Sequence, residues 1–485
     1  MKNISFQILK NSSSIPDNIA ISTLSDDITY GLLEKILWAF AIRMKMNGID
    51  SSSCVAIQTY EPIKSICSIL ALGMIGASWV RATPKALSNT AINITHLLYT
   101  EGMQSIKEVT SIKIDGTWLS DTTQSNEAIH SHGIRGNHND TDIWMIAQSS
   151  GTTGNQKFMA LSYENYWNRN KKTSLTHDFY PVITACLFPS LSGAWVSYNL
   201  RTLGSQGTLV FGESLDFFIK MNVQKVFGSP KQFDGFLKKY TQPLQDRLPI
   251  AHIAGASISK GFTEKIFQHF NVIHNFYGAT EVGGIARKVI SVPTEETANV
   301  GQILAGNHVE IVDEMHKQLP NGVEGLIRVK NNIMVSEYLS NDKATAEFIV
   351  DGWFYTGDRG YINVDRELFI TGRSDDLLNI GGVKINATDI DKIINACPDI
   401  KEGFCFQQKN DATVDNLMAI ICVQKGVVVS QALSKFEQMM KKELPKVKRI
   451  SGVFVVDQIP HNLNGKLMRN EAQRIVIGLI PHWFS

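Results

Sequence analysis

Short apolar segments alternate with helix-like stretches through the middle of this 485-residue chain, and this alternation constrains its fold most strongly. Each segment is short enough for one strand. The segments are Val182–Leu187, Thr208–Phe211, Lys225–Phe227, Ile250–Ala254 and Val272–Phe276. Strands joined by helices build parallel sheets that carry helices on their faces. The pattern therefore predicts an α/β protein with mostly parallel sheets.

The region before these segments shows the same alternation. Thr29 is suited to cap a helix, and Cys54–Thr59 reads as a short strand. The longest apolar run, Ile66–Val80, is interrupted by Gly73 and Gly76. It is shorter than the roughly 20 residues that cross a bilayer. We therefore expect a buried helix there, and no membrane span.

A loop rich in glycine and hydroxyl groups follows the apolar strand Ile143–Ala147 and precedes a helical stretch that begins at Tyr163. Its residues are Ser149, Ser150, Gly151, Thr152, Thr153, Gly154, Asn155, Gln156 and Lys157. Glycines let backbone N–H groups approach phosphate oxygens, the hydroxyls add donors, and the lysine adds a positive charge. The spacing G-x-x-x-x-G-K-[ST] of P-loop NTPases is absent. Taken alone, the loop fits either a phosphate site or a plain turn.

The kind of predicted element changes after Gly301. Short strands are predicted at His308–Val312, Gly325–Val329 and Tyr361–Asn363, with turns at Asn321-Gly322 and Asp351-Gly352. After residues 372–376 the chain reads as a small α+β unit. Its predicted elements are helices 387–396 and 430–444 and strands 403–407, 417–423 and 452–456. We therefore predict an N-terminal domain of residues 1–374 and a C-terminal domain of residues 375–485.

Composition excludes several classes of protein. The net charge is +1, which argues against a nucleic-acid binder that relies on a general basic field. The six cysteines form no CxxC pair, so neither a disulfide framework nor a zinc site is indicated. The N-terminus soon becomes polar and lacks the apolar core of a signal peptide. These features favour the cytoplasm.

Four further segments offer polar groups that suit a nucleotide. Asn275–Glu281 combines an aromatic ring, a hydroxyl and a carboxylate, and Tyr355–Asp358 places an acid after a glycine. Gly372–Asp376 supplies a cation and two acids, and Asn464–Lys466 supplies a lysine after a turn. Each has a structural alternative: Glu281 could neighbour a helix N-cap, Asp358 could be a turn acid, and Arg373 a surface cation.

As an ordered set, these motifs resemble the adenylate-forming superfamily of acyl- and aryl-CoA synthetases, peptide-synthetase adenylation domains and firefly luciferase. The resemblance runs from Thr29–Leu33, similar to the family's early "TYxxL", to Gly465-Lys466. It implies a two-step reaction in which ATP and a carboxylate give an acyl-adenylate, and a thiol then takes the acyl group. The cofactors implied are ATP, Mg²⁺, and CoA or a phosphopantetheinyl carrier protein.

The resemblance also assigns roles to residues. The loop with Ser149, Ser150, Gly151, Thr152, Thr153, Gly154 and Lys157 would hold the β- and γ-phosphates. Tyr277, with Gly278 next to it, would lie against adenine. Thr280 would contact the α-phosphate, and Glu281 would bind Mg²⁺. Asp358 would accept hydrogen bonds from the ribose hydroxyls, with Arg373 alongside.

The C-terminal region supplies the remaining roles that the resemblance implies. Lys466 would bridge the carboxylate and the α-phosphate during adenylation. Asp375 would be the hinge about which the C-terminal domain rotates between half-reactions. Gly381 and Gly382 resemble the loop beside the pantetheine tunnel.

The acyl pocket of the family is lined from positions that hold mostly aromatic and small residues here. They are Trp195, Tyr198, Ala254, Gly255, Ala256, Val282, Gly283 and Gly284. Such a lining suits a medium-sized or aromatic carboxylic acid. The alternative is that Trp195 and Tyr198 are helix core. No acid lies between Phe188 and Trp195, where amino-acid-activating members usually carry one, so a free α-amino acid is disfavoured.

The chain departs from the family pattern in two further places. Gln156 replaces a proline and Phe158 replaces a glycine beside Lys157, so the loop is less pre-set while the lysine charge survives. The histidine that many members carry near Ser192 is absent.

Two other functions remain open from the sequence. The adenylate could pass to a non-thiol acceptor such as an amine, or the protein could be a catalytically reduced nucleotide- or acyl-binding protein. We expect no carrier-protein domain, so a thiol acceptor would arrive as CoA or as a free-standing carrier. The basic residues Lys441, Lys442 and Lys446–Arg449 could dock such a partner, but a solvated face is favoured.

Overall fold

The computed structural model describes residues 2–89, 91–102, 109–120, 122, 134, 138–150, 156–176, 181–212, 214–293, 298–374, 377–380, 383–408, 416–443, 450–461 and 467–483. It divides into two compact units. The first contains residues 1–149, 156–309 and 329–354, and the second contains residues 150–155, 310–328 and 355–485. The domain boundary expected between residues 374 and 375 stays a prediction.

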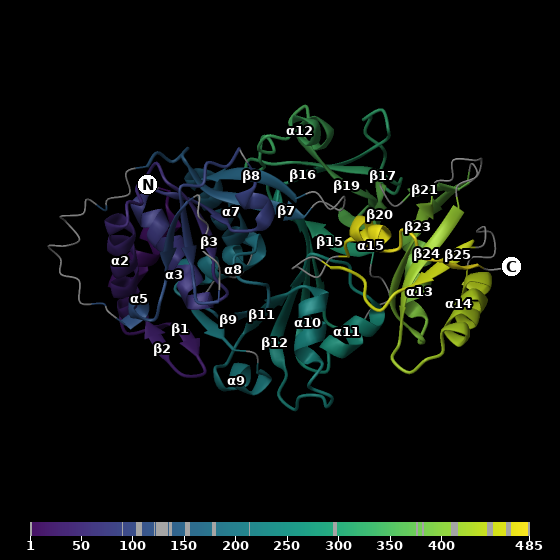
Figure 1. Ribbon diagram of the computed structural model, residues 1–485, viewed down its shortest axis with the longest axis horizontal. Helices are drawn as coiled ribbons and strands as arrows, with labels where there is room; N and C mark the ends of the chain where they lie inside the picture. The colour runs from purple at the N-terminus through teal and green to yellow at the C-terminus, as the bar shows by residue number, and fades with distance from the viewer. Residues whose placement is uncertain are drawn as a thin grey trace. The chain divides into compact units, whose positions relative to one another are not determined.

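A six-stranded sheet forms one layer of the first unit, in the order β6-β5-β3-β4-β7-β8 (Figure 1). The strands are β3 (Cys54–Gln58), β4 (Ser78–Arg81), β5 (His96–Tyr99), β6 (Thr110–Lys113), β7 (Ile143–Ser150) and β8 (Gln156–Ser162). Its pairs β6–β5, β5–β3, β3–β4 and β4–β7 are parallel, as predicted.

Helices α1 (Ile4–Ser14), α2 (Tyr30–Met46), α3 (Pro62–Ile75) and α5 (Thr117–Ser120) belong to the same unit. Thr29 caps α2, since its hydroxyl accepts a hydrogen bond from Leu32 N. Nearly every residue of α3 is buried, as expected for an apolar helix. The helix ends earlier than predicted, because Gly76 takes the left-handed conformation with φ 92°. Trp79 and Val80 therefore belong to β4 instead.

A second sheet of the first unit follows the order β15-β14-β13-β12-β11-β9-β10-β1-β2. Its strands are β1 (Ile19–Thr23), β2 (Asp27–Thr29), β9 (Ile183–Cys186), β10 (Thr208–Phe211), β11 (Lys225–Gly228), β12 (Leu248–Ala254), β13 (Phe270–Ala279), β14 (Gly283–Ile290) and β15 (Asn299–Ile303). The five apolar segments predicted as strands between residues 182 and 276 form β9 to β13, and these strands pair in parallel. Parallel strands end at the same edge of a sheet, so their last residues lie together.

The connecting helices of this sheet begin at serine caps. They are α7 (Tyr163–Thr176), α8 (Gly193–Gly204), α9 (Leu215–Lys220), α10 (Pro230–Leu237) and α11 (Lys260–Ile266). Ser192, Ser214 and Ser259 each accept a hydrogen bond from the third residue of the following turn. Such caps satisfy N–H groups that a helix leaves unpaired.

The segment between Asn307 and Arg373 carries β16 (His308–Val312), β17 (Gly325–Lys330), α12 (Asp342–Phe348), β18 (Ile349–Val350), β19 (Trp353–Ile362) and β20 (Glu367–Arg373). Asp351 and Gly352 have φ values of 51° and 73° between the paired residues Val350 and Trp353. Two positive φ values make the two-residue hairpin turn that Asp-Gly predicts. The strand expected at Tyr361–Asn363 is the end of β19, which begins at Trp353.

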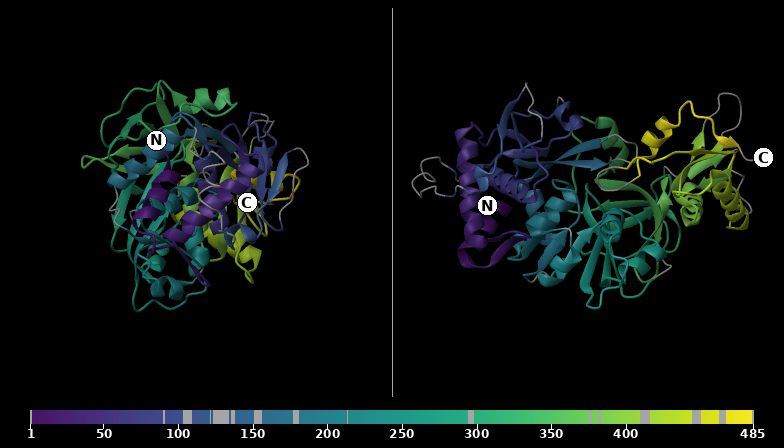
Figure 2. Two further views of the ribbon diagram at one scale, coloured as in Figure 1. Left: turned by 90° about the vertical axis from the view of Figure 1, so that its left-hand side faces the viewer. Right: turned by 60° about the horizontal axis from the view of Figure 1, so that its bottom comes forward.

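The C-terminal part of the second unit is a sheet between helices, as Figures 1 and 2 show. The sheet β23 (Ile400–Gln408), β24 (Asn416–Val423), β25 (Gly452–Val455) and β26 (His482–Trp483) is preceded by the hairpin β21 (Leu377–Ile380) and β22 (Val383–Asn386). Helices α13 (Ala387–Ala396) and α14 (Val429–Glu443) pack on one face, and α15 (Arg469–Ile475) packs on the other. Alternate residues of β24 enter the two cores, as its pleat requires.

No helix among the described residues is long and apolar enough to cross a membrane.

Gly301 ties strand β15 against β14 and gives a test of this packing. Its φ is 84°, and a Cβ atom there would lie 2.2 Å from the carbonyl oxygen of Arg287. Gly301→Ala should lower the free energy of unfolding by about 3 kcal/mol or more, measured by urea titration.

Gly48→Ala is the matched control. Gly48 has φ 85°, but the nearest heavy atom to an added Cβ is 3.8 Å away. The loss should be about 1–2 kcal/mol, from backbone strain alone. Equal losses in the two variants would show that the close approach at Gly301 is not a packing constraint.

Candidate functional site

The predicted phosphate loop joins β7 to β8. Ser149 lies buried at the end of β7, and Lys157 is the second residue of β8. Gly151, Thr152, Thr153 and Gly154 lie outside the described residues, as do the side chains of Ser150 and Gln156. The structure therefore describes the two strands that flank the loop.

Lys157 is nearly buried, at 9% exposure, and lies over two aromatic rings. Its Nζ is 3.4 Å from the ring centre of Phe348 and 5.0 Å from that of Tyr338. A cation at this distance is attracted by the negative face of a ring. The lysine charge is thus held beside the segment 338–348 of the same unit.

Phe158, the departure from the family pattern next to Lys157, is part of a core. Its side chain is buried among residues such as Val80 and Ile146. Its carbonyl accepts a hydrogen bond of 2.8 Å from Leu339 N, and Leu339 packs against the same cluster. Phe158 therefore contacts segment 338–348 through its backbone carbonyl and through the cluster that its side chain shares with Leu339.

Glu281 is buried in the turn between β13 and β14, where Tyr338 donates a hydrogen bond of 2.8 Å from its Oη to Oε1. Because strands flank the turn, the alternative of a helix N-cap neighbour is wrong. Burial, and then the carboxylate of Glu281, raise the pKa of the Tyr338 phenol. Tyr338 thus remains a donor at neutral and mildly alkaline pH.

Tyr338 was not predicted from the sequence. It lies 57 residues after Glu281 and lines up with no strand or loop pattern. No signal in the chain could have paired the two side chains.

The strand β13 leads directly into this turn. Tyr277 and Thr280 are half-buried. A Cβ atom at Gly278 would lie 2.5 Å from the carbonyl oxygen of Gly283, so only glycine fits between the paired strands. The structure thus brings Tyr277, Gly278, Thr280, Glu281, Gly283 and Gly284 into one hairpin.

Aromatic rings stack at the carboxyl ends of the parallel strands. Tyr198, from α8, stacks on Phe227 of β11 with ring centres 4.2 Å apart. His252 of β12 stacks on Phe276 of β13 at 4.0 Å, and its Nε2 lies 3.0 Å from the Oη of Tyr198. Of these residues, only Tyr198 was predicted from the sequence to line an acyl pocket, and His252, Phe227 and Phe276 were not. Their positions near the ends of predicted parallel strands were the signal that could have found them.

The other predicted acyl-pocket residues differ in burial. Trp195 is 2% exposed and stacks on Phe211 inside the main core of the first unit. Gly255 and Ala256 are exposed after β12, Ala254 is half-buried, and Gly255 has φ 94°. The environment of Trp195 is that of a core residue, whereas Tyr198 lies at the strand ends.

Asp358 and Arg373 are paired in the second unit. They face each other in the register of β19 and β20, and Arg373 Nη1 donates to Asp358 Oδ1 at 2.9 Å. Gly357, with φ 74°, precedes the acid, and Thr356 Oγ1 accepts from Asp358 N. Both side chains are largely buried, so the alternatives of a turn acid and a surface cation are wrong.

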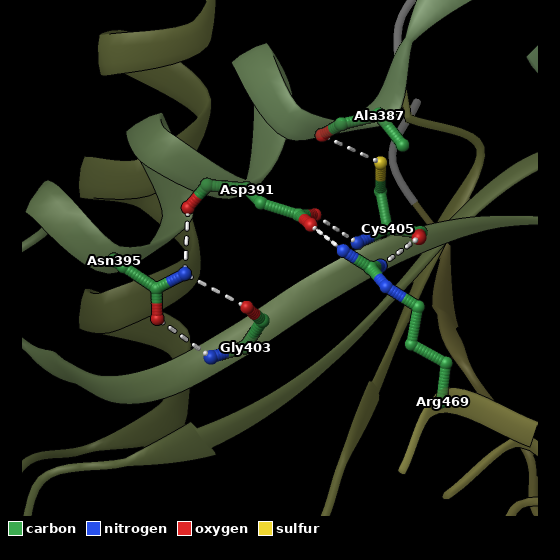
Figure 3. Close-up of polar contacts among 6 residues, drawn as sticks. All are labelled: Ala387, Asp391, Asn395, Gly403, Cys405 and Arg469. Atoms are coloured by element: carbon green, nitrogen blue, oxygen red, sulfur yellow. Dashed lines mark hydrogen bonds and ion pairs between the residues drawn. The ribbon is translucent and has the colours of Figure 1, made fainter. Parts of the chain in front are cut away.

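Lys466, Asp375, Gly381 and Gly382 lie outside the described residues. Residues 462–466 are bracketed by an antiparallel bridge between His461 and Leu467. Beyond the bridge, Arg469 pairs with Asp391 of α13 and donates 3.2 Å to the carbonyl of Cys405 in β23 (Figure 3). Asp391 also accepts from Cys405 N at 2.7 Å. The chain after Lys466 is thus anchored to the C-terminal core.

Comparison with known proteins places the chain in a family. Residues 10–339, more than half of the chain, match the family of AMP-binding enzymes. The chain belongs to this family. The adenylate-forming resemblance drawn from its motifs is therefore confirmed.

Relatives match along nearly the whole chain. A 2-succinylbenzoate–CoA ligase from Bacillus cytotoxicus is 25% identical over 480 residues, which cover 95% of this chain and 96% of the relative. The crystal structure of ATP-bound MatB from Rhodopseudomonas palustris has a TM-score of 0.80 at 20% identity, covering 98% of this chain and 99% of that chain. The amide bond synthetase McbA from Marinactinospora thermotolerans has a TM-score of 0.80 at 18% identity, covering 97% and 99%. These structures confirm the α/β fold class.

The residues of this AMP-binding enzyme fit a Mg²⁺ ion that is shared with a nucleotide. No group of three or more metal-binding side chains occurs among the described residues. Mg²⁺ in nucleotide sites is commonly held by one or two carboxylates together with substrate phosphates. Glu281 supplies such a carboxylate, and its bond with Tyr338 leaves lone pairs for a cation.

Tyr338→Phe tests the bond that orients Glu281. The buried carboxylate would lose its donor, so the free energy of unfolding in urea should fall by about 1.5–3 kcal/mol. Tyr60→Phe, at a tyrosine that is 71% exposed, should change it by less than about 0.5 kcal/mol. Matching values for the two variants would mean that the Tyr338–Glu281 bond contributes nothing to stability.

Proposed function

We propose that this protein uses ATP to activate a carboxylic acid as an acyl-adenylate and then transfers the acyl group to a thiol. The observation that carries the proposal is the buried Glu281 carboxylate, which Tyr338 orients beside Thr280 in a chain that belongs to the AMP-binding enzymes. A buried acid next to a hydroxyl suits a magnesium–phosphate complex, because a carboxylate can ligate the cation and a hydroxyl can donate a hydrogen bond to a phosphate oxygen.

In the first half-reaction, a carboxylate oxygen attacks the α-phosphorus of ATP. The bond from that phosphorus to the bridging oxygen breaks, and pyrophosphate leaves. Two anions must approach, so positive charge has to offset their repulsion. Lys157 supplies one charge near the end of the phosphate loop, and Lys466 supplies the bridge between carboxylate and α-phosphate.

The cation that Glu281 would hold supplies further charge neutralisation at the phosphates. The Thr280 hydroxyl donates a hydrogen bond to the α-phosphate. Asp358, oriented by Arg373, accepts hydrogen bonds from the ribose hydroxyls. The phosphate loop of residues 149–157 binds the β- and γ-phosphates.

In the second half-reaction, a thiolate attacks the acyl carbon of the adenylate. The bond from that carbon to the phosphate oxygen breaks, AMP leaves, and a thioester forms. We favour CoA as the thiol because relatives that match most of the chain are CoA ligases for 2-succinylbenzoate and 4-chlorobenzoate. A free-standing carrier protein is the other thiol source, and Gly381 and Gly382 would lie beside the pantetheine.

A medium-sized or aromatic acid suits the proposed site. Tyr198 and Phe276 are the partly exposed rings of a stack that also contains the buried Phe227 and His252, and this stack lies toward the strand ends, where ligands of open parallel sheets bind. Planar rings stack on the faces of aromatic rings.

An acceptor amine is the second candidate. The fold is shared with an amide bond synthetase, in which the acyl group passes to nitrogen. This reading keeps the first half-reaction unchanged and differs only in the nucleophile.

Acid-dependent exchange of pyrophosphate into ATP tests the first half-reaction. A panel of aliphatic and aromatic carboxylic acids should include at least one that supports exchange in the presence of Mg²⁺, and aromatic acids should be preferred. The same acids are then assayed with CoA, with carrier protein and with amines. Absence of exchange with every acid would refute adenylation, and product formation only with amines would refute the thiol.

Lys466→Ala separates the two half-reactions. Exchange should fall by about 100-fold or more, since the charge between the two anions is lost, while a supplied acyl-adenylate should still react with the thiol. Lys435→Ala, which removes a surface ion pair with Asp399 in the same unit, should leave both steps unchanged. An equal loss of both half-reactions in Lys466→Ala would contradict the role given to this lysine.

A further inference from the structure

Arg169 of helix α7 binds three carbonyl groups from two separate parts of the chain. Its Nη1 donates to Thr280 O at 2.7 Å, and its Nη2 donates to Glu281 O at 3.0 Å. Its Nη2 and Nε also reach Ile333 O, at 2.8 and 3.2 Å. One guanidinium thus joins α7, the turn between β13 and β14, and the segment that leads to Tyr338.

The arginine is itself held in place from its own helix. Asn165, one turn earlier, accepts from Arg169 Nε at 2.7 Å and donates to Ile333 O at 3.2 Å. The surroundings lower the pKa of Arg169 to about 10, mainly by desolvation, while Glu281 opposes the shift. The side chain is therefore charged at neutral pH, and its planar fork is fixed before any ligand binds.

Other side chains bind backbone carbonyls that follow Glu281 in the hairpin. Asn331 donates to Val282 O at 3.0 Å, and Asn307 donates to Gly284 O and Ile285 O at 3.0 and 3.1 Å. Val335 N donates to Glu281 O at 2.9 Å. The backbone carbonyls of Thr280 and Glu281 accept side-chain hydrogen bonds from Arg169.

We propose that Arg169 is a positioning residue for adenylation: it holds the backbone at Thr280 and Glu281 so that the hydroxyl and the carboxylate meet the α-phosphate and its magnesium. This inference rests on the proposed function for the roles of Thr280 and Glu281. Arg169 acts through their carbonyls and takes no part in the chemistry. A displacement of about 1 Å at such groups can reduce a rate by about 100-fold.

Arg169→Lys is the main test, since lysine keeps the charge but cannot reach three carbonyls in the guanidinium geometry. Exchange of pyrophosphate into ATP should fall about 10–100-fold in kcat, and the Mg²⁺ concentration for half-maximal exchange should rise several-fold. The KM for the acid and the reaction of a supplied acyl-adenylate with the thiol should stay within about twofold of the parent protein.

Two further variants, a complete truncation and a control, are measured beside Arg169→Lys. Arg169→Ala should show a larger loss of exchange, which millimolar guanidinium partly restores. Lys171→Ala, at an exposed residue two positions along the same helix, should match the parent in every assay. The unfolding transition of each variant is measured by circular dichroism, and all assays are run at a temperature below it.

The inference is tested first in a parent protein that exchanges pyrophosphate. There, equal losses of the two half-reactions in Arg169→Lys, or an unchanged Mg²⁺ requirement, would show that Arg169 is only a structural residue and would overturn the inference. If the parent protein supports no exchange with any acid, the proposed function fails.

Calorimetric titration with Mg²⁺ and ATP then tests the role of Arg169 separately. Arg169→Lys should weaken Mg²⁺-dependent ATP binding, and unchanged binding would overturn the inference.

Discussion

The hydrogen bonds that end on the backbone between Thr280 and Ile285 are the constraint on which the first unit's site depends. Carbonyl groups here accept from the side chains of Arg169, Asn331 and Asn307, in addition to the pairing of β13 with β14. A hairpin turn tied only to its own strands could adjust when a charged ligand arrives. One tied by side chains from distant elements presents its hydroxyl and carboxylate in a fixed geometry, which costs no reorganisation during reaction.

The segment after β17 depends on the same constraint. Ile333 O binds Arg169, Val335 N binds Glu281 O, and Leu339 N binds Phe158 O. Tyr338 is therefore held from both sides when it donates to Glu281. Its ring also lies near Lys157, so the phosphate-loop lysine and the acid of the hairpin share one aromatic support. Phe158 fits this arrangement because its side chain anchors β8 where the neighbouring segment attaches.

The sequence predicted most elements of the fold because their patterns are local. Short apolar segments located β9 to β13, Thr29 located the start of α2, and Asp351-Gly352 located a hairpin turn. The end of α3 was predicted wrongly because an apolar run looks the same in a buried helix and a buried strand. Motifs in the sequence singled out Glu281, Asp358 and Arg373, and the roles given to these residues stay predictions. Arg169, Tyr338 and His252 escaped because their partners are distant in the chain and no spacing rule relates them.

The aromatic rings at the strand ends bear on the acid that we propose as the substrate. His252 contacts Tyr198 Oη and stacks on Phe276, so its polar edge has a partner while its faces are covered by carbon. The polar atoms of His252 and Tyr198 are therefore partnered with each other within the stack of rings. In the proposed site, an acid with a planar apolar body would contact the partly exposed rings of Tyr198 and Phe276, whereas an ammonium group on the acid would lose its hydration without a carboxylate to replace it. No acid lies between Phe188 and Trp195 to supply that carboxylate, and the stack itself contains none. The proposed preference for a neutral aromatic acid over an amino acid therefore rests on the apolar composition of this stack, for either acceptor of the acyl group.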